Sequence, residues 1–189
     1  MIINSTTFLP YGKQNCINGP IANIEIIVPI PTFPPRINPT IKNVTDGVAA
    51  CKKSGADVIV AVGGGSSIDT SKGISIVMTN PDRADIKSLN GASNTINRGM
   101  PIIALPTTAG TAAEVTINYV ITDEERKIKM VCVDPNDIPI VAIVDSELMA
   151  SMPKSLAAAT GMDALTHALE GYITKAHNEM SDMFHIKAI

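Results

Sequence analysis

Short apolar runs alternate with helical patterns along the middle of the chain, and this alternation predicts an α/β fold. Uninterrupted β-prone runs occur at 58–62, 101–105 and 140–144. Runs without polar alternation are typical of strands buried on both faces, as in parallel sheets. A helical stretch from about Ser67 to Met78 follows the first run across a glycine turn, so strand, turn and helix form half of a βαβ unit.

The first 39 residues differ from the rest of the chain, because they contain seven of its 13 prolines. Proline fixes φ and lacks an amide donor, which excludes helices and central strands from most of this region. We predict one short strand from Ile24 to Val28 and otherwise irregular structure over 9–37. Regular structure then begins with a helix expected from Thr40 to about Ser54, closed by Gly55.

The second half of the chain passes from mixed to helical structure. Apolar segments at 118–122 and 129–133 flank the charged turn 123–127, which predicts a β-hairpin. From Ser146 onward the pattern is helical only, notably over 155–172 and from Ser181 to the end. We therefore predict two domains, an α/β domain over 1–150 that is shortened near 9–37, and a helical domain that begins over 151–189.

Composition and charge exclude several classes of function. The chain is 45% hydrophobic and 17% charged, with a formal net charge of −3, and its basic residues occur at most two or three together. Such a chain lacks the basic patch that binding to nucleic acid needs. No window approaches the ~18 consecutive apolar residues of a membrane span. Three widely spaced cysteines, Cys16, Cys51 and Cys132, form neither a disulfide framework nor a paired-thiol zinc motif, so we expect a cytoplasmic protein.

The first candidate for chemistry is the segment Gly63-Gly64-Gly65-Ser66-Ser67-Ile68-Asp69, between a buried strand and a helix N-terminus. Glycines let backbone amides approach a ligand, and the positive end of the helix favours an anion such as a pyrophosphate. The alternative is a tight turn in which Ser66 or Ser67 is the N-cap. The spacing matches neither the Rossmann fingerprint nor the Walker motif, since Lys72 lies too far along the chain.

A second loop, Thr107-Thr108-Ala109-Gly110-Thr111, follows the next buried strand. Ligands of open α/β sheets bind beyond the carboxyl ends of the strands, where hydroxyls and free amides suit a ribose or a phosphate. The alternative is a polar turn that caps the next helix.

A third pair, Asp163 and His167, has the i,i+4 spacing that places both side chains on one helix face. Carboxylate and imidazole together suit divalent iron, zinc or manganese. The alternative is a surface ion pair, because two ligands do not complete a metal site. The remaining histidines, His177 and His185, fit surface or packing positions better than a metal shell.

Taken in order, three motifs resemble the iron-type (group III) alcohol dehydrogenases. They are Gly63-Gly64-Gly65-Ser66 with Asp69, then Pro106 to Thr116 (PTTAGTAAEVT), then Gly161 to Tyr172 (GMDALTHALEGY). The stretches 118–125 and 131–135 are most similar to the lactaldehyde reductase, or propanediol oxidoreductase, branch. The resemblance covers about 38–189, and Met1 to Phe8 looks like the first strand of the family.

This resemblance implies a dinucleotide-binding domain, a helical metal-binding domain and an active site in the cleft between them. It implies NAD as the cofactor and Fe²⁺ as the metal, with Zn²⁺ as the alternative, and leaves NADP open. Asp163 and His167 match the first two metal ligands. The cofactor-binding positions implied are Asn38, Gly64, Gly65, Ser66, Asp69, Thr107, Thr108, Thr111, Val120 and Lys129. The reaction implied is the reversible reduction of lactaldehyde or a similar small aldehyde, with the metal as Lewis acid.

Two departures from the family pattern lead us to expect a truncated chain. The proline-rich segment is too short for the strand, helix and strand that read the adenosine ribose, and the family's third and fourth metal ligands lie beyond Ile189. A catalytically inactive remnant that binds nucleotide or a full-length homologue is therefore the alternative function. A relation to glycerol dehydrogenase or dehydroquinate synthase is a third reading, which the stretch 118–125 disfavours. Unpaired apolar residues on the last helices (Leu156, Leu165, Ala168, Leu169, Met183, Ile186) predict self-association.

Overall fold

A four-stranded parallel sheet forms the centre of the computed structural model, which describes residues 24–27 and 38–189. Its strands are β1 (Ile24–Ile27), β2 (Val58–Gly63), β4 (Ile102–Pro106) and β7 (Val141–Ala142), in the order β1-β2-β4-β7. The register pairs Ile24 with Val58, and Gly63 with Pro106. The predicted strands and parallel sheet are thus confirmed, whereas the expectations for Met1 to Phe8 and for the rest of 9–37 lie outside the described residues.

A second sheet contains the predicted hairpin. Strands β5 (Asn118–Asp123) and β6 (Ile128–Val133) are antiparallel, and the short β3 (Gly91–Ala92) pairs with β6 in parallel. The order β3-β6-β5 makes β5 an edge strand of this sheet. Five 3₁₀ helices connect the elements within the described residues: Pro81–Arg83, Ile86–Leu89, Ala113–Val115, Pro135–Asp137 and Ser146–Met149.

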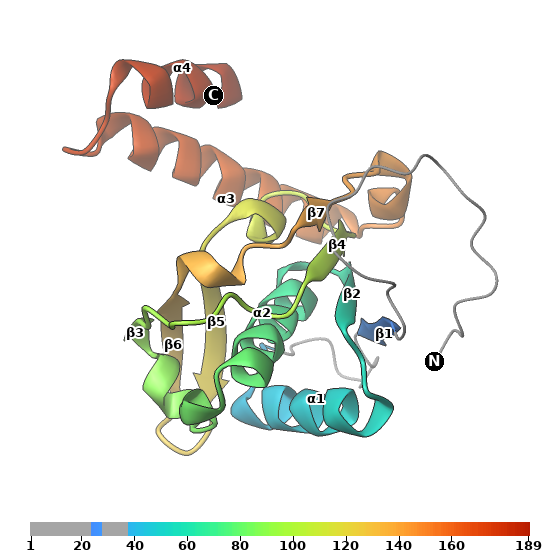
Figure 1. The fold of residues 1–189 in the computed structure, drawn as a ribbon. Helices are drawn as coiled ribbons and strands as arrows, with labels where there is room; N and C mark the ends of the chain where they lie inside the picture. Colours follow the sequence, from blue (N-terminus) through green and yellow to red (C-terminus); the bar gives the residue numbers. More distant parts are fainter. Residues whose placement is uncertain (1–23, 28–37) are drawn as a thin grey trace, which may run out of the picture.

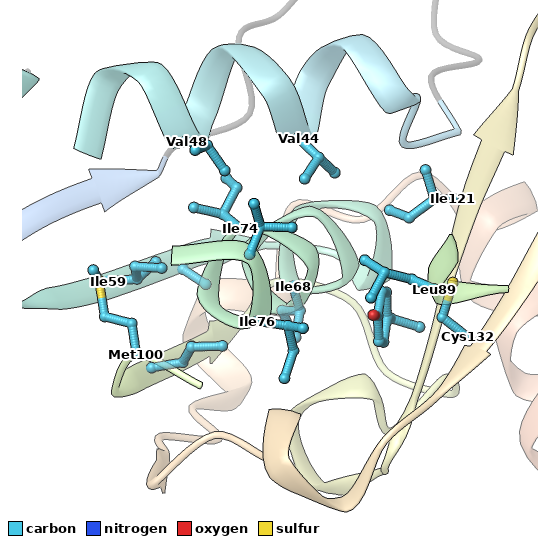
Figure 2. Packing of buried hydrophobic residues seen from close by; sticks show 14 of the residues in the cluster. Val44, Val48, Ile59, Ile68, Ile74, Ile76, Leu89, Met100, Ile121 and Cys132 are labelled. Atoms are coloured by element: carbon cyan, nitrogen blue, oxygen red, sulfur yellow. The ribbon is translucent and has the colours of Figure 1, made fainter. Parts of the chain in front are cut away.

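Helices α1 (Ile41–Ser54) and α2 (Gly65–Thr79) lie between the two sheets and join them through a shared core (Figure 1). Helix α1 begins with a capping box between Thr40 and Asn43, and ends at Gly55, whose positive φ of 67° suits glycine. Figure 2 shows Val44 and Val48 of α1 pointing toward Ile74 of α2. Ile59 of β2 and Ile121 of β5 belong to the same cluster, so the core extends through both sheets.

Strand β7 is shorter and more exposed than the apolar run 140–144 predicts. Val141 is 43% exposed and Val144 is 64% exposed, so the expectation of a strand buried on both faces is wrong here. The physical reason is that β7 pairs with β4 on one side only, and the described elements leave its side chains uncovered.

Two helices follow, α3 (Lys154–Ile173) and α4 (Glu179–Ala188), which lie side by side and extend away from the sheets (Figure 1). Most of their apolar side chains are exposed, as predicted, including Leu156, Leu169, Met183 and Ile186. Ala168 is an exception, because it is buried within the described residues rather than left uncovered. Within the described part of the chain, no helix combines the length and apolar character needed to cross a membrane.

Candidate cofactor and metal site

The glycine loop forms the junction between β2 and α2. Gly63 ends the strand with a φ of 148°, and Gly64 is the N-cap of a helix that begins at Gly65. The helix therefore starts two residues earlier than predicted, and the alternative in which Ser66 or Ser67 is the N-cap is wrong. No side chain caps this end, which leaves the first-turn amides and the positive helix terminus facing outward, the arrangement that favours an anion.

The threonine loop lies directly against the glycine loop. Parallel pairing sets Pro106 beside Gly63, and the Thr107 amide donates to the Gly63 carbonyl at 2.9 Å. A Cβ atom on Gly64 would lie 3.0 Å from Oγ1 of Thr108, and one on Gly65 would lie 3.1 Å from Oγ1 of Thr111. Only glycine leaves room for this approach, so the two predicted motifs form one surface at the carboxyl edge of the sheet.

The alternative reading of the threonine loop, as a helix cap, holds only in part. The 3₁₀ helix Ala113–Val115 has Ala112 at its N-cap with no side-chain cap. Oγ1 of Thr111 accepts from the Ala113 amide at 3.4 Å, which is a weak contact at that helix start. Thr107 and Thr108 are half-buried beside the glycines and make no such capping bond, so they remain available to a ligand.

Asp69, one turn into α2, is held by the neighbouring hairpin. Its Oδ2 atom accepts a hydrogen bond from the Val120 amide at 3.0 Å. Burial raises the pKa of this carboxyl to about 6, against the lowering effects of that amide and of Lys72. Because one of its oxygens already has a backbone partner, Asp69 is tied to β5 as well as to the glycine loop.

Asn38 and Lys129 lie farther along β5, on either side of Thr122. Asn38 precedes Pro39, whose carbonyl accepts the Thr122 amide at 2.6 Å, and Lys129 is paired with Thr122 across the hairpin. Both side chains are exposed. The structure thus brings the predicted cofactor residues into two groups, the two loops in direct contact and a second group along β5, linked by the contact between Asp69 and Val120.

Gly110 connects the threonine loop to the metal-binding motif. Its φ is 124°, and a Cβ atom there would collide with the backbone carbonyl of Thr160 in α3. Thr160 lies one helical turn before Asp163, so the candidate cofactor and metal residues share one side of the molecule. Sequence reasoning did not single out Gly110, although a glycine within a loop of threonines indicates a close backbone approach.

Asp163 and His167 do converge on one face of α3. Oδ1 of Asp163 lies 3.9 Å from Nε2 of His167, and the two side chains are 45% and 58% exposed. The oxygen and nitrogen donors fit two positions of a divalent metal shell. Over 38–189, however, no cluster of three potential ligands occurs: His177 lies 2.9 Å from Asp182, and His185 packs against Gly171.

Lys72 is the polar residue whose place in the structure sequence reasoning missed. It is fully buried, its Nζ lies 3.9 Å from Oδ1 of the equally buried Asp137, and burial lowers its pKa while raising that of Asp137. The signal was its position four residues from Ile68 and from Ile76, which places Lys72 on the apolar side of α2.

Comparison with known protein families identifies the arrangement of these loops. The family model described as "Iron-containing alcohol dehydrogenase" matches residues 30–146, and "Fe-containing alcohol dehydrogenase family, C-terminal" matches residues 157–189. The chain belongs to the iron-containing alcohol dehydrogenase family. The resemblance noted in the sequence motifs is thereby confirmed.

Individual members of the family are similar over most of this chain. Lactaldehyde reductase of Escherichia coli (strain K12) is 59% identical over 152 residues, which are 80% of this chain and 40% of that protein. The structure of a 1,3-propanediol oxidoreductase matches with a TM-score of 0.76 and 45% identity, over 80% of this chain and 39% of that one. A sulfoacetaldehyde reductase of Bifidobacterium kashiwanohense in complex with NAD⁺ matches with a TM-score of 0.70 and 37% identity, over 79% and 40% of the two chains. This chain therefore spans about 40% of the length of the relatives it matches.

Proposed function

We propose that this chain binds a nicotinamide dinucleotide where the glycine loop meets the threonine loop. The observation that carries the proposal is the contact between Gly64 and Thr108 and between Gly65 and Thr111, which leaves two backbones and three hydroxyls at the carboxyl edge of the sheet. This edge is where open α/β sheets bind nucleotides. The NAD⁺ complex of a relative that is 37% identical supports NAD rather than NADP.

The roles of the individual residues follow from their places in the structure. The amides of Gly64, Gly65 and Ser66 would hold the pyrophosphate at the uncapped end of α2. The threonine hydroxyls would hold the adjoining phosphate or ribose oxygens. The proposed cofactor positions are Asn38, Gly64, Gly65, Ser66, Asp69, Thr107, Thr108, Thr111, Val120 and Lys129.

The proposed reaction of the whole protein is the reversible NAD-linked reduction of lactaldehyde or a similar small aldehyde to an alcohol. Asp163 and His167 would supply two of the three or four protein ligands that a catalytic metal needs. When bound, Fe²⁺, or Zn²⁺ as the alternative, supplies a Lewis acid that polarises the substrate oxygen. The contact of Gly110 with Thr160 keeps this pair close to the cofactor loops, so this chain positions the cofactor beside the metal.

The domain division at about residue 150 and a place in the cytoplasm belong to the same proposal. Helix-only structure after Ile143 supports the division into an α/β domain over 1–150 and a helical domain from 151. The absence of a disulfide among the described residues is consistent with a reducing compartment.

A second candidate, nucleotide binding without turnover, has one observation in its favour. Asp163 and His167 have no third ligand near them within 38–189. If this chain acts alone, its loops bind dinucleotide while the metal chemistry is absent.

Two measurements test these candidates. Quenching of protein fluorescence, or enhancement of NADH fluorescence, on titration with NADH tests dinucleotide binding directly, and absence of binding would overturn the proposal. Oxidation of 1,2-propanediol with NAD⁺ and added Fe²⁺ then separates the candidates. Turnover supports the dehydrogenase, whereas NADH binding without turnover supports the second candidate.

A further inference from the structure

The outer edge of β5 is occupied by side chains instead of another strand. The backbone groups of Asn118, Val120 and Thr122 that point away from β6 lie on this edge, because backbone groups two residues apart in a strand face the same side. The Asn118 carbonyl accepts from Nζ of Lys72 at 2.9 Å, and the Val120 amide donates to Asp69 at 3.0 Å. The Thr122 amide donates to the Pro39 carbonyl at 2.6 Å. Every one of these backbone groups therefore has a partner, as buried backbone requires.

The charges on α2 match the polarity of the strand edge. Lys72, a donor only, meets carbonyls, and Asp69, an acceptor when ionised, meets an amide. The two side chains are three residues apart on α2 and so reach the same strand. Asp137 lies 3.9 Å from Lys72 and supplies the opposing charge that a buried ammonium needs.

Lys72 also holds the far end of the threonine loop. Its Nζ donates to the Thr116 carbonyl at 2.5 Å, and Oγ1 of Thr116 lies 3.4 Å away. The near end of the same loop is fixed by the bond from the Thr107 amide to the Gly63 carbonyl. The loop that faces the glycines is thus attached at both ends, once to β2 and once to α2.

We propose that Lys72 is a positioning residue for the cofactor site, acting through Thr116 and Asn118 to hold the threonine loop and β5 against α2. The same helix provides the glycine-loop end at which we place the pyrophosphate. Lys72 thereby sets the spacing between the two loops without touching the cofactor itself. The inference rests on the proposed function only for the identity of the ligand, since the attachment of the strand can be measured without it.

The test removes the ammonium without leaving an uncompensated buried charge. In the double variant Lys72→Met with Asp137→Asn, both members of the ion pair are neutral, so thermal stability should exceed that of Lys72→Met alone. The carbonyls of Thr116 and Asn118 still lose their donor. We expect NADH affinity to fall by about tenfold in the double variant, because a small displacement of a binding loop has effects of this order.

Amide hydrogen exchange gives a readout that does not depend on NADH. In the double variant, exchange over 116–120 should be faster than in wild type, while exchange over 41–54 in α1 stays the same. Val48→Ala is the matched control, because Val48 is buried in α1 away from this edge. It should lower thermal stability without changing NADH affinity or exchange over 116–120.

The outcomes separate this inference from the proposed function. If wild type does not bind NADH, the proposed function fails and the exchange data alone decide on Lys72. Wild-type NADH affinity with unchanged exchange over 116–120 in the double variant would overturn the positioning role. If the double variant does not fold, wild type decides: the Val120 amide should exchange as slowly as those of Tyr119 and Ile121, and exchange typical of an unpaired amide would overturn the inference.

Discussion

Single residues of this site act through the space they leave or the charge they bury. Gly64 and Gly65 leave room for threonine side chains, and Asp69 buries a carboxyl between two loops. Neither effect is visible as a motif of catalytic groups. Both lead to predictions for one substitution at a time.

Gly65→Val should close the space between the two loops. The Cβ atom alone would lie 3.1 Å from Oγ1 of Thr111, and the valine methyls need still more room. We expect about 1–3 kcal/mol lower unfolding free energy, the usual cost of overpacking, and at least tenfold weaker NADH binding, at roughly 1.4 kcal/mol per factor of ten. Urea unfolding and NADH titration check the two effects.

Gly161→Val is the matched control, because a Cβ atom at Gly161 has no heavy atom within 4 Å. Valine and glycine differ in helix propensity by about 0.5 kcal/mol, so the control should unfold at nearly the wild-type urea concentration. Equal losses of NADH affinity in both variants would contradict the argument about loop spacing.

Asp69 should make stability depend on pH between about 4 and 6. Burial raises the pKa of this carboxyl to about 6 in the folded protein, above the value of 3.8 that applies to an exposed carboxyl. The folded state therefore binds the proton more tightly, so the contribution of Asp69 to stability is present below pH 4 and is lost as pH rises through 6.

Asp69→Asn removes this titration while keeping an oxygen that can accept from the Val120 amide. The unfolding free energy of wild type minus that of the variant should fall by about 2 kcal/mol between pH 4 and pH 7. Urea titrations at several pH values measure the difference. A difference that stays constant over this range would show that the burial of Asp69 does not perturb its ionisation.

At the scale of elements, local sequence signals decide where helices begin and end. Helix α1 has a capping box at Thr40 and Asn43 and a left-handed glycine at its end, and both boundaries are predictable from the sequence. Helix α2 lacks a side-chain cap and begins at a glycine, so the usual preference for serine at the N-cap gave the wrong start. The exception occurs at the proposed ligand site.

Thr40→Ala should lower the unfolding free energy by about 1 kcal/mol, because Oγ1 of Thr40 is the acceptor for the Asn43 amide at the start of α1. Thr45→Ala in the same helix is the control. Oγ1 of Thr45 bonds only to the preceding turn, and alanine has the higher helix propensity. Thermal unfolding of both variants checks the prediction, and equal losses would indicate that the cap contributes nothing.

The sequence predicts this fold to the extent that local pattern decides it. The strands at 58–63 and 102–106, the hairpin and both loops follow from apolar runs and glycine positions. Burial of β7 could not be predicted, because it depends on which elements cover the strand. The partners of Lys72, 44 to 65 residues away along the chain, depend on how the elements pack, and no local signal specifies them.

At the scale of the whole molecule, the two sheets share one core while α3 and α4 stand apart from it (Figure 1). Exposed apolar side chains gather on these two helices, among them Met162, Leu169, Ile173, Met180, Met183, Phe184 and Ile186. A contiguous apolar surface of this kind favours contact with another protein surface.

We therefore predict that the chain self-associates through α3 and α4. Sedimentation velocity should show species larger than 19.9 kDa, and replacing Met180 and Phe184 by serine should shift the distribution toward monomer. Ile96→Ser is the control, because Ile96 is 92% exposed but lies in the α/β part. A monodisperse wild-type monomer would contradict the prediction.

The attachment of β5 to α2 has one further consequence. An edge strand with free amides and carbonyls can recruit a strand from another molecule and begin an aggregate. Because Lys72, Asp69 and Pro39 already occupy the outer edge of β5, that edge offers a second chain no ladder on which to add. The buried charges that hold the site together also protect this sheet from growing between molecules.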